Sequence, residues 1–131
     1  MSSLISSIAA VIVIVSFVGL IILQLLLALG KPYGRMTYGG KYEVLPTKYR
    51  IMSVFADVIF IVAIFFVLVK VELIAVFPFP VIANLGLWFF AFYLGLNTLA
   101  NVTSKSQSEK QIMTPISLIT CICLFIIALG L

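Results

Sequence analysis

The sequence contains no histidine and very few charged side chains. Of its 131 residues, 9% are charged and 64% are hydrophobic, whereas a soluble domain carries about 25% charged residues. Without histidine the chain lacks the most common general base and metal ligand of proteins. No nucleophile–base pair or cluster of metal-ligating residues replaces it, so we expect no catalytic site, no metal and no cofactor. A membrane enzyme is therefore the least favoured function class.

Cysteine is nearly absent as well. The two cysteines, Cys121 and Cys123, lie inside an apolar run, where thiols pack as small buried hydrophobic groups. The single residue between them is too short a spacing for the dithiol chemistry of a Cys-x-x-Cys motif. The sequence therefore does not favour a disulfide framework or a redox function.

What the sequence has in abundance is long apolar runs. A helix that crosses a bilayer needs about 20 mostly apolar residues. The chain holds four such segments, at residues 5–29, 51–69, 80–101 and 115–131, and the last is short enough to need an added turn from residues 109–114. No basic n-region precedes the first run, so we expect a spanning helix and not a signal peptide. The predicted fold class is all-α: one domain, residues 1–131, that forms a compact bundle of four transmembrane helices.

Three connections join these spans. Residues 30–50 and 102–114 form polar loops, whereas residues 70–80 are apolar enough to lie in the membrane interface. The second polar loop is rich in serine, and Ser106 or Ser108 is expected to cap the fourth helix.

Basic residues are distributed unevenly among these connections. The two polar loops hold seven of the eight Lys and Arg residues, and the opposite side holds only Lys70. Basic loops stay on the cytoplasmic side of a membrane. We therefore predict a multi-pass protein of the cell (plasma) membrane, with both polar loops cytoplasmic and both termini extracytoplasmic.

The first loop contains parts of a phosphate-binding pattern: Gly34, Gly39, Gly40 and Lys41. A P-loop needs Lys and then Ser or Thr directly after its second glycine. Here Gly40 intervenes, and the residue after Lys41 is neither Ser nor Thr. We instead expect a tight turn at residues 38–41, with basic side chains held at anionic lipid headgroups.

The two polar loops are expected to touch and to form a composite loop surface for anionic lipid headgroups or a partner. Glu109 is the only acid of the second polar loop, and its candidate partners across the gap are Arg35, Lys41, Lys48 and Arg50. The residues predicted for the composite loop surface are Gly34, Arg35, Gly39, Gly40, Lys41, Arg50, Ser104, Ser106 and Glu109.

An intramembrane polar cluster is predicted from Gln24, Asp57, Asn97 and Asn101, which interrupt the apolar spans at a similar depth. At 1.5 Å per residue, Gln24 and Asp57 lie roughly 10 Å below the surface that carries the loops. A carboxylate that faces lipid costs about 2.5–3.5 kcal/mol on insertion scales. Asp57 is therefore expected to face the bundle interior and to find partners, with Arg50 two turns away on the same face. The cluster is either structural or a substrate or proton site.

The third span carries a further packing signal. Ala91 and Gly95 are one helical turn apart, and pairs of small residues at this spacing let two transmembrane helices approach closely. We expect this face of the third span to pack against another helix.

Both polar loops have a characteristic spacing. The first reads Gly30-x-Pro32-x-Gly34-x-x-x-x-Gly39-Gly40-x-x-x-x-Leu45-Pro46-x-x-x-Arg50, and the second reads Asn101-x-x-Ser104-x-Ser106-x-x-Glu109, followed by Pro115. This pattern resembles the loops of an uncharacterised family of small four-helix bacterial integral membrane proteins. The resemblance implies a bacterial inner membrane and brings no activity with it. The small multidrug transporters are similar in length and span count, but they rely on a carboxylate in the first span, where this chain has only Gln24.

Two functions from different classes stay open. The first is a non-enzymatic membrane protein that binds anionic lipid headgroups or a partner through the composite loop surface. The alternative is a small transporter or channel subunit that uses Asp57 and forms a homo-oligomer, because four short helices enclose little volume. Membrane lipids are expected partners in both cases, and nucleic acid in neither.

Overall fold

The computed structural model describes residues 4–71 and 80–131. Four α-helices follow one another along the chain: α1 (Leu4–Ala28), α2 (Thr47–Lys70), α3 (Pro80–Val102) and α4 (Thr114–Leu129). A π-helical turn, Glu109–Met113, precedes α4, and together they form the fourth helix, long and apolar enough to cross a membrane like the other three. The prediction of an all-α protein with four spans is confirmed. Most of the predicted interfacial segment, residues 72–79, lies outside the described residues.

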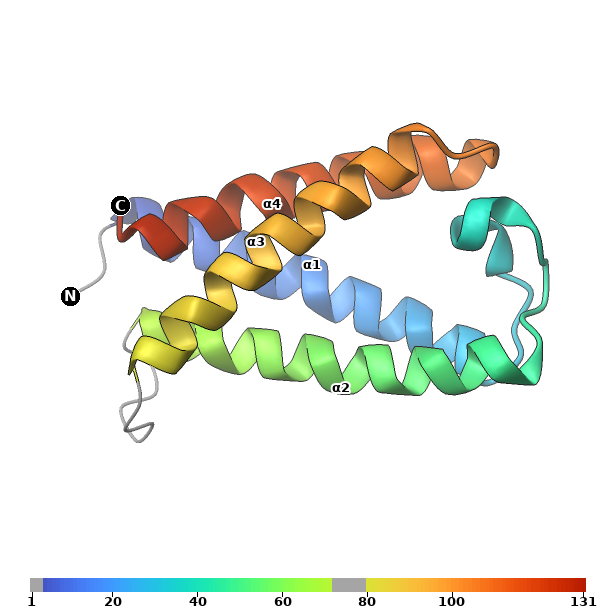
Figure 1. The fold of residues 1–131 in the computed structure, drawn as a ribbon, viewed down its shortest axis with the longest axis horizontal. Coiled ribbons are helices and arrows are strands. Elements are labelled where there is room, and N and C mark those ends of the chain that lie inside the picture. The colour runs from blue at the N-terminus through green and yellow to red at the C-terminus, as the bar shows by residue number, and fades with distance from the viewer. Residues whose placement is uncertain (1–3, 72–79) are drawn as a thin grey trace.

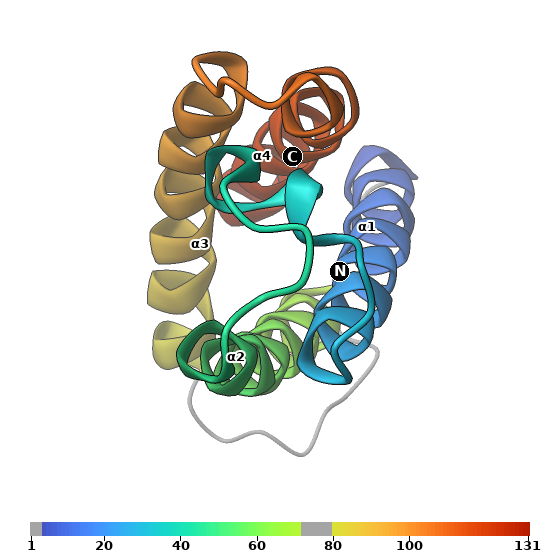
Figure 2. The ribbon, with the colours of Figure 1, turned by 90° about the vertical axis from the view of Figure 1, so that its right-hand side faces the viewer.

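The helices form a ring in which each helix packs against two others. α1 packs on α2, α2 on α3, α3 on α4, and α4 on α1. Figure 2 shows this order from one end of the bundle, with the first polar loop crossing that end. Both polar loops lie at this end, and the start of α1 and the end of α4 lie at the other (Figure 1). This arrangement agrees with four antiparallel spans.

The outward faces of the helices suit lipid and not water. On α1, Val11 and Val15 are exposed, whereas Val13, Phe17 and Leu20 are buried. The buried residues recur three or four positions apart, which places them on one side of the helix. The other three helices also expose many large hydrophobic side chains, so a continuous apolar belt surrounds the bundle.

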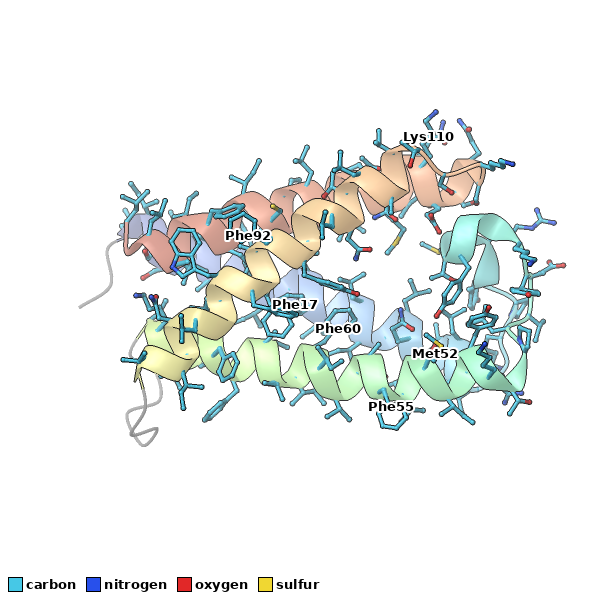
Figure 3. All side chains as sticks on the ribbon, in the orientation of Figure 1. Phe17, Met52, Phe55, Phe60, Phe92 and Lys110 are labelled. Atoms are coloured by element: carbon cyan, nitrogen blue, oxygen red, sulfur yellow. The ribbon has the colours of Figure 1, made fainter. Side chains whose placement is uncertain are left out.

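Aromatic rings join three helices in the middle of the bundle. The ring of Phe17 stacks on Phe60 with their centroids 5.4 Å apart, and it meets the edge of Phe90 at 6.5 Å. Figure 3 shows Phe17 and Phe60 close together at mid-bundle. Such ring pairs stabilise beyond their buried area, and here they tie α1, α2 and α3 together below the loops.

The predicted close packing of α3 is confirmed. Ala91 is buried, and its carbonyl accepts a hydrogen bond from Cys121 Sγ at 3.2 Å. A Cβ atom at Gly95 would lie 3.6 Å from the same sulfur. Small residues on α3 thus let α4 approach its backbone. Cys121 and Cys123 are both free and buried, which agrees with their predicted role as small hydrophobic groups.

At the loop end, the helices extend beyond the apolar runs. α2 begins at Thr47, ahead of the apolar run that starts at Ile51. The helical residues that lead into α4 begin at Gln107, ahead of Pro115. An apolar run ends where the bilayer ends, whereas a helix ends where its backbone hydrogen bonds stop. Both polar loops are therefore shorter than predicted.

Ser106 is the residue that caps the fourth helix. Its Oγ accepts a hydrogen bond from Glu109 N at 3.4 Å, which is the Ser-x-x-Glu spacing typical of a helix start. Further along, Pro115 has no N–H, and its ring conflicts with the carbonyl four residues earlier. The helix accommodates this proline by widening into the π-helical turn Glu109–Met113.

Candidate functional site

The two polar loops contact each other, as predicted. Ser106 Oγ donates a hydrogen bond to Arg35 O, and Gly39 N donates one to Glu109 Oε2 at 3.3 Å. The approach is close at Gly40, where a Cβ atom would lie 2.6 Å from Ser106 Cβ. These contacts hold the first loop across the end of the bundle (Figure 2).

The predicted tight turn makes this contact. Lys41 N donates to Tyr38 O at 3.3 Å and closes the turn. Tyr38, Gly39 and Gly40 all have positive φ, at 51°, 68° and 76°. Glycine adopts this conformation at little cost, whereas tyrosine adopts it rarely. The turn directs the backbone N–H of Gly39 toward the carboxylate of Glu109.

Glu109 does not pair with the basic side chains predicted for it. Only 6% of this residue is exposed, and within residues 4–71 and 80–131 its carboxylate forms no ion pair. Its partner is the backbone of Gly39 because the turn brings main chain, and not side chains, to the start of the fourth helix.

Arg50 lies where the sequence did not predict it. Its Nε donates to Ala28 O at 3.0 Å, so its positive charge lies at the negative end of the α1 dipole. Arg50 therefore does not bond to Asp57, which lies two turns further along the same helix. The last carbonyl groups of a helix have no partner within that helix. Those of α1 are at the same level of the bundle as Arg50, whereas the carboxylate of Asp57 is two turns deeper.

Tyrosines surround the turn. The ring centroids of Tyr38 and Tyr49 are 4.5 Å apart, and those of Tyr42 and Tyr49 are 5.5 Å apart. Burial raises the pKa of the Tyr38 phenol above its ordinary value of 10.0, and the neighbouring phenols of Tyr49 and Tyr93 add to the rise. Tyr38 is therefore a neutral phenol that can both donate and accept hydrogen bonds.

Beneath the turn lies a cavity of about 620 Å³, which we call the loop-end cavity. Its walls come from α1, α2, α3, the first loop and the start of the fourth helix. The residues that line it are Leu20, Gln24, Met36, Thr37, Tyr38, Gly39, Met52, Phe55, Ala56, Ile59, Phe60, Tyr93, Asn97, Ala100, Asn101, Ser104, Glu109 and Met113. Amides, phenols, hydroxyls and one carboxylate thus share the cavity with aliphatic and aromatic groups, which is the composition of a site for an amphipathic molecule.

Three of the four residues predicted as the intramembrane polar cluster line this cavity: Gln24, Asn97 and Asn101. Asn101 is buried, and its Nδ2 donates to Ser117 Oγ at 3.1 Å and to Met113 O at 3.4 Å. Gln24 and Asn97 are half-buried, and their side chains make no hydrogen bond within the described part of the chain. Their amide groups remain available to a ligand.

Asp57, the fourth residue of the predicted cluster, is separate from the cavity. Only 6% of Asp57 is exposed, and neither carboxylate oxygen has a hydrogen-bond partner among the described residues. Its neighbour Ala56 lines the cavity, but successive helical residues point about 100° apart around the axis. The expectation that Asp57 faces the interior is confirmed, and the expectation that it finds partners there is wrong.

Several polar groups in and beside this cavity were not predicted from the sequence. Tyr38 and Tyr93 line the cavity, and Thr98 Oγ1 donates to Ser117 Oγ at 3.1 Å, beside the bond that Asn101 makes to the same oxygen. Thr98 precedes Asn101 by three residues, so the helical period could have placed both on one face. No local signal relates the two tyrosines, because they are brought together only by the fold.

The residues of the predicted composite loop surface divide into two kinds. Arg35 and Lys41 are exposed, whereas Gly34 is buried beneath the carbonyl of Glu43, to which its N–H donates at 2.8 Å. Ser104 lines the cavity. Arg35 and Lys41 belong to the outer surface, whereas the contact between the loops joins the backbone of Arg35 and Gly39 to the side chains of Ser106 and Glu109.

No protein-family model, curated protein or solved structure matches this chain. Among the described residues, no group of three or more His, Cys, Asp or Glu side chains could hold a metal ion. The groups present can bind ions at the basic outer surface and can form hydrogen bonds inside the cavity.

Proposed function

We propose that this chain is a non-enzymatic integral membrane protein whose composite loop surface binds anionic lipid headgroups. The observation that carries the proposal is the charge at the loop end. The basic side chains that are exposed there are Lys31, Arg35, Lys41, Lys48, Lys105 and Lys110. Of the two acids of these loops, Glu43 is exposed and Glu109 is buried. Each basic residue near an anionic bilayer surface contributes about 1 kcal/mol of attraction.

The contact between the loops supports a single binding surface. Lys105 belongs to the second polar loop, and Arg35 and Lys41 belong to the first. Hydrogen bonds join the backbone of the first loop to the side chains of Ser106 and Glu109, so the basic groups of both loops belong to one connected surface. These basic side chains surround the ends of the helices. The apolar faces of the helices end there, at the level of the lipid headgroups and their phosphates.

The charge distribution also supports an orientation. The loop end carries seven of the eight basic residues, so we assign it to the cytoplasmic side and the termini to the outside. The resemblance of the two loops to those of small four-helix bacterial proteins adds the expectation that the membrane is a bacterial inner membrane.

Native mass spectrometry of the purified protein with added lipid tests this function. Phosphatidylglycerol should bind more tightly than phosphatidylcholine with the same acyl chains. The double variant Lys41→Gln/Lys105→Gln should lose about 30-fold in affinity for phosphatidylglycerol at low salt, from about 1 kcal/mol for each lysine. Binding to phosphatidylcholine should be unchanged.

The matched control is Lys70→Gln, which removes a charge at the other end of the bundle. Lys70 Nζ donates to Asn84 Oδ1 at 2.8 Å there, far from the loops. We expect Lys70→Gln to change phosphatidylglycerol affinity less than twofold. Equal affinity for the two lipids, or an equal effect of both variants, would contradict the proposal.

A second candidate function is a small transporter or channel subunit, and Asp57 favours it. A buried carboxylate without a hydrogen-bond partner is costly inside a bilayer, and proton or cation transfer would account for its presence. Liposomes that contain the protein and a pH-sensitive dye test this candidate. Proton flux above that of empty liposomes, lost in Asp57→Asn and kept in Glu43→Gln, would support it. Flux no greater than in empty liposomes would exclude proton transfer through Asp57.

A further inference from the structure

The loop-end cavity is bordered by exposed side chains of two neighbouring helices. Met52, Phe55 and Ile59 of α2 and Tyr93 and Ala100 of α3 line it and are exposed. Figure 3 shows Met52 and Phe55 on the part of α2 nearest the loops, where α2 and α3 diverge (Figure 1). Since the exposed side chains of this bundle meet lipid, a hydrophobic molecule can enter between α2 and α3, while the first loop covers the end of the cavity.

Many of the side chains that line the cavity are apolar. Leu20, Phe60 and Met113 are among them, and the ring of Phe60 stacks on that of Phe17. A cavity of about 620 Å³ lies within the usual range of small-molecule sites, about 300–1,000 Å³. The apolar part can therefore accommodate the hydrophobic body of a ligand.

The part of the cavity near the loops carries one formal charge, and it is negative. Glu109 lines the cavity, whereas none of its lining residues is Lys or Arg. Glu109 is more than nine-tenths buried and forms no ion pair within the described residues; Oε2 accepts one hydrogen bond from Gly39 N. A buried carboxylate that lacks a cation is costly, and a cation beside it would offset that cost.

The other polar and aromatic groups of the cavity also suit a cation. The side-chain carbonyls of Gln24 and Asn97, which make no hydrogen bond within the described residues, can turn toward a positive charge. The rings of Tyr38 and Tyr93 line the same region, and the faces of aromatic rings attract cations.

From these observations we propose that the loop-end cavity binds a lipophilic cation, a molecule with an apolar body and one positive charge, and that Glu109 is its counter-ion. The ligand enters from the bilayer between α2 and α3, with its apolar body against Phe60 and its charge near the loops. The site is separate from the basic outer surface, and its occupation does not depend on the binding of anionic lipid.

The basic residues of the loops do not oppose this site. Six of these seven side chains are exposed on the outer surface, and the seventh, that of Arg50, bonds to Ala28 O and does not line the cavity. Salt screens charges in water over about 8 Å at physiological ionic strength. A ligand that arrives through the bilayer does not cross that surface. The negative charge that the ligand meets inside is that of Glu109, which is screened much less.

The test uses the whole protein in phosphatidylcholine nanodiscs with radiolabelled tetraphenylphosphonium. Tetraphenylborate has nearly the same size and shape and the opposite charge, so it is the matched control ligand. We expect saturable binding of the phosphonium above that of empty nanodiscs, and at least tenfold weaker binding of the borate. Absence of saturable phosphonium binding, or equal binding of the two ions, overturns the proposal.

Glu109→Gln tests the counter-ion. The glutamine carbonyl can still accept the hydrogen bond from Gly39 N, so the loops should stay joined while the charge is lost. Phosphonium affinity should fall at least tenfold. The matched control Glu43→Gln removes an exposed acid of the first loop that does not line the cavity, and it should change affinity less than twofold. An unchanged affinity in Glu109→Gln overturns the role of Glu109.

A second pair of variants tests the lateral opening without altering the charged group. Ala100→Trp places a large ring at the opening, whereas Leu99→Trp places the same ring on the neighbouring exposed position, which does not line the cavity. Phosphonium binding should fall at least fivefold in the first variant and stay within twofold in the second. Equal phosphonium binding to the two tryptophan variants overturns the proposed location. This test does not depend on Glu109→Gln, so it remains decisive if that variant does not fold.

Discussion

At the scale of single residues, Asp57 is the side chain least suited to its surroundings. It is buried on α2, and neither oxygen has a hydrogen-bond partner among the described residues. Had Asp57 bonded to the amides of Gln24 or Asn97, its removal would leave those amides unsatisfied. Because it does not, replacement by an apolar residue removes a cost and orphans no partner.

We therefore predict that Asp57→Leu raises the free energy of unfolding by about 1–3 kcal/mol, the usual cost of an unsatisfied buried polar group. Reversible unfolding in mixed micelles measures this change. Val58→Leu, at the exposed neighbouring position, is the control and should be close to neutral. A less stable Asp57→Leu protein would mean that the carboxylate has a stabilising partner.

Two glycines of the first loop provide a matched pair at the same scale. Gly39 and Gly40 both have positive φ, so alanine is strained at either position by roughly 1–2 kcal/mol. They differ in surroundings: a Cβ atom at Gly40 would meet Ser106 at 2.6 Å, and one at Gly39 would have nothing within 4 Å. An added methyl group would therefore press on the second polar loop at Gly40 and not at Gly39, whose N–H is kept in alanine.

We predict that Gly40→Ala separates the two polar loops, whereas Gly39→Ala strains only its own turn. Amide hydrogen exchange measured by mass spectrometry distinguishes these effects. Gly40→Ala should speed exchange in peptides from both residues 34–44 and residues 102–110. Gly39→Ala should speed it in the first segment alone. Identical patterns in the two variants would show that Ser106 yields to the added methyl group.

At the scale of elements, the hydroxyl group of Ser117 makes several of the hydrogen bonds at the junction of α3 with α4. Ser117 Oγ accepts hydrogen bonds from Asn101 Nδ2 and Thr98 Oγ1, both at 3.1 Å, and donates to Met113 O at 2.8 Å. Met113 ends the π-helical turn, so this network attaches the widened part of the fourth helix to α3. The same turn contains Glu109, and its position in the cavity therefore depends on the junction.

We predict that Ser117→Ala lowers the free energy of unfolding by about 1 kcal/mol, as is typical of polar contacts between membrane helices. Thr120→Val is the control because, within the described part of the chain, Thr120 Oγ1 bonds only to Ile116 O of its own helix. Unfolding in mixed micelles should show a smaller loss for the control. Equal losses of unfolding free energy in the two variants would mean that the bonds between Ser117 and α3 contribute no stability beyond that of the bond within the fourth helix.

At the scale of the whole molecule, both polar loops lie at one end and the outer ends of α1 and α4 at the other. Seven of the eight basic residues lie at the loop end, which predicts that this end is cytoplasmic.

Single cysteines at Ser2 and Gln107, in a background with Cys121 and Cys123 replaced by alanine, test the orientation. An impermeant thiol reagent should label Ser2→Cys and not Gln107→Cys in intact cells; the reverse pattern would invert the topology.

What the sequence by itself determined was the type of fold and the positions of the spans. Within a bilayer a backbone must satisfy its own hydrogen bonds, so a long apolar run has helix as its main solution. The runs near residues 5–29, 51–69 and 80–101 therefore match α1, α2 and α3 closely, with α2 starting a turn early. The turn at residues 38–41 and the cap at Ser106 were also predictable, because both depend on interactions between residues close in sequence.

Only the tertiary structure decided which polar groups meet. Depth in the membrane follows from residue number, and on that basis Asp57 belonged with Gln24, Asn97 and Asn101. The direction of a side chain follows instead from the rotation of each helix against its neighbours, and this turns Asp57 away from the cavity that the other three line. Glu109 likewise bonds to the backbone N–H of Gly39 and not to an arginine or lysine side chain. These outcomes depend on contacts between residues far apart in sequence, which local patterns do not encode.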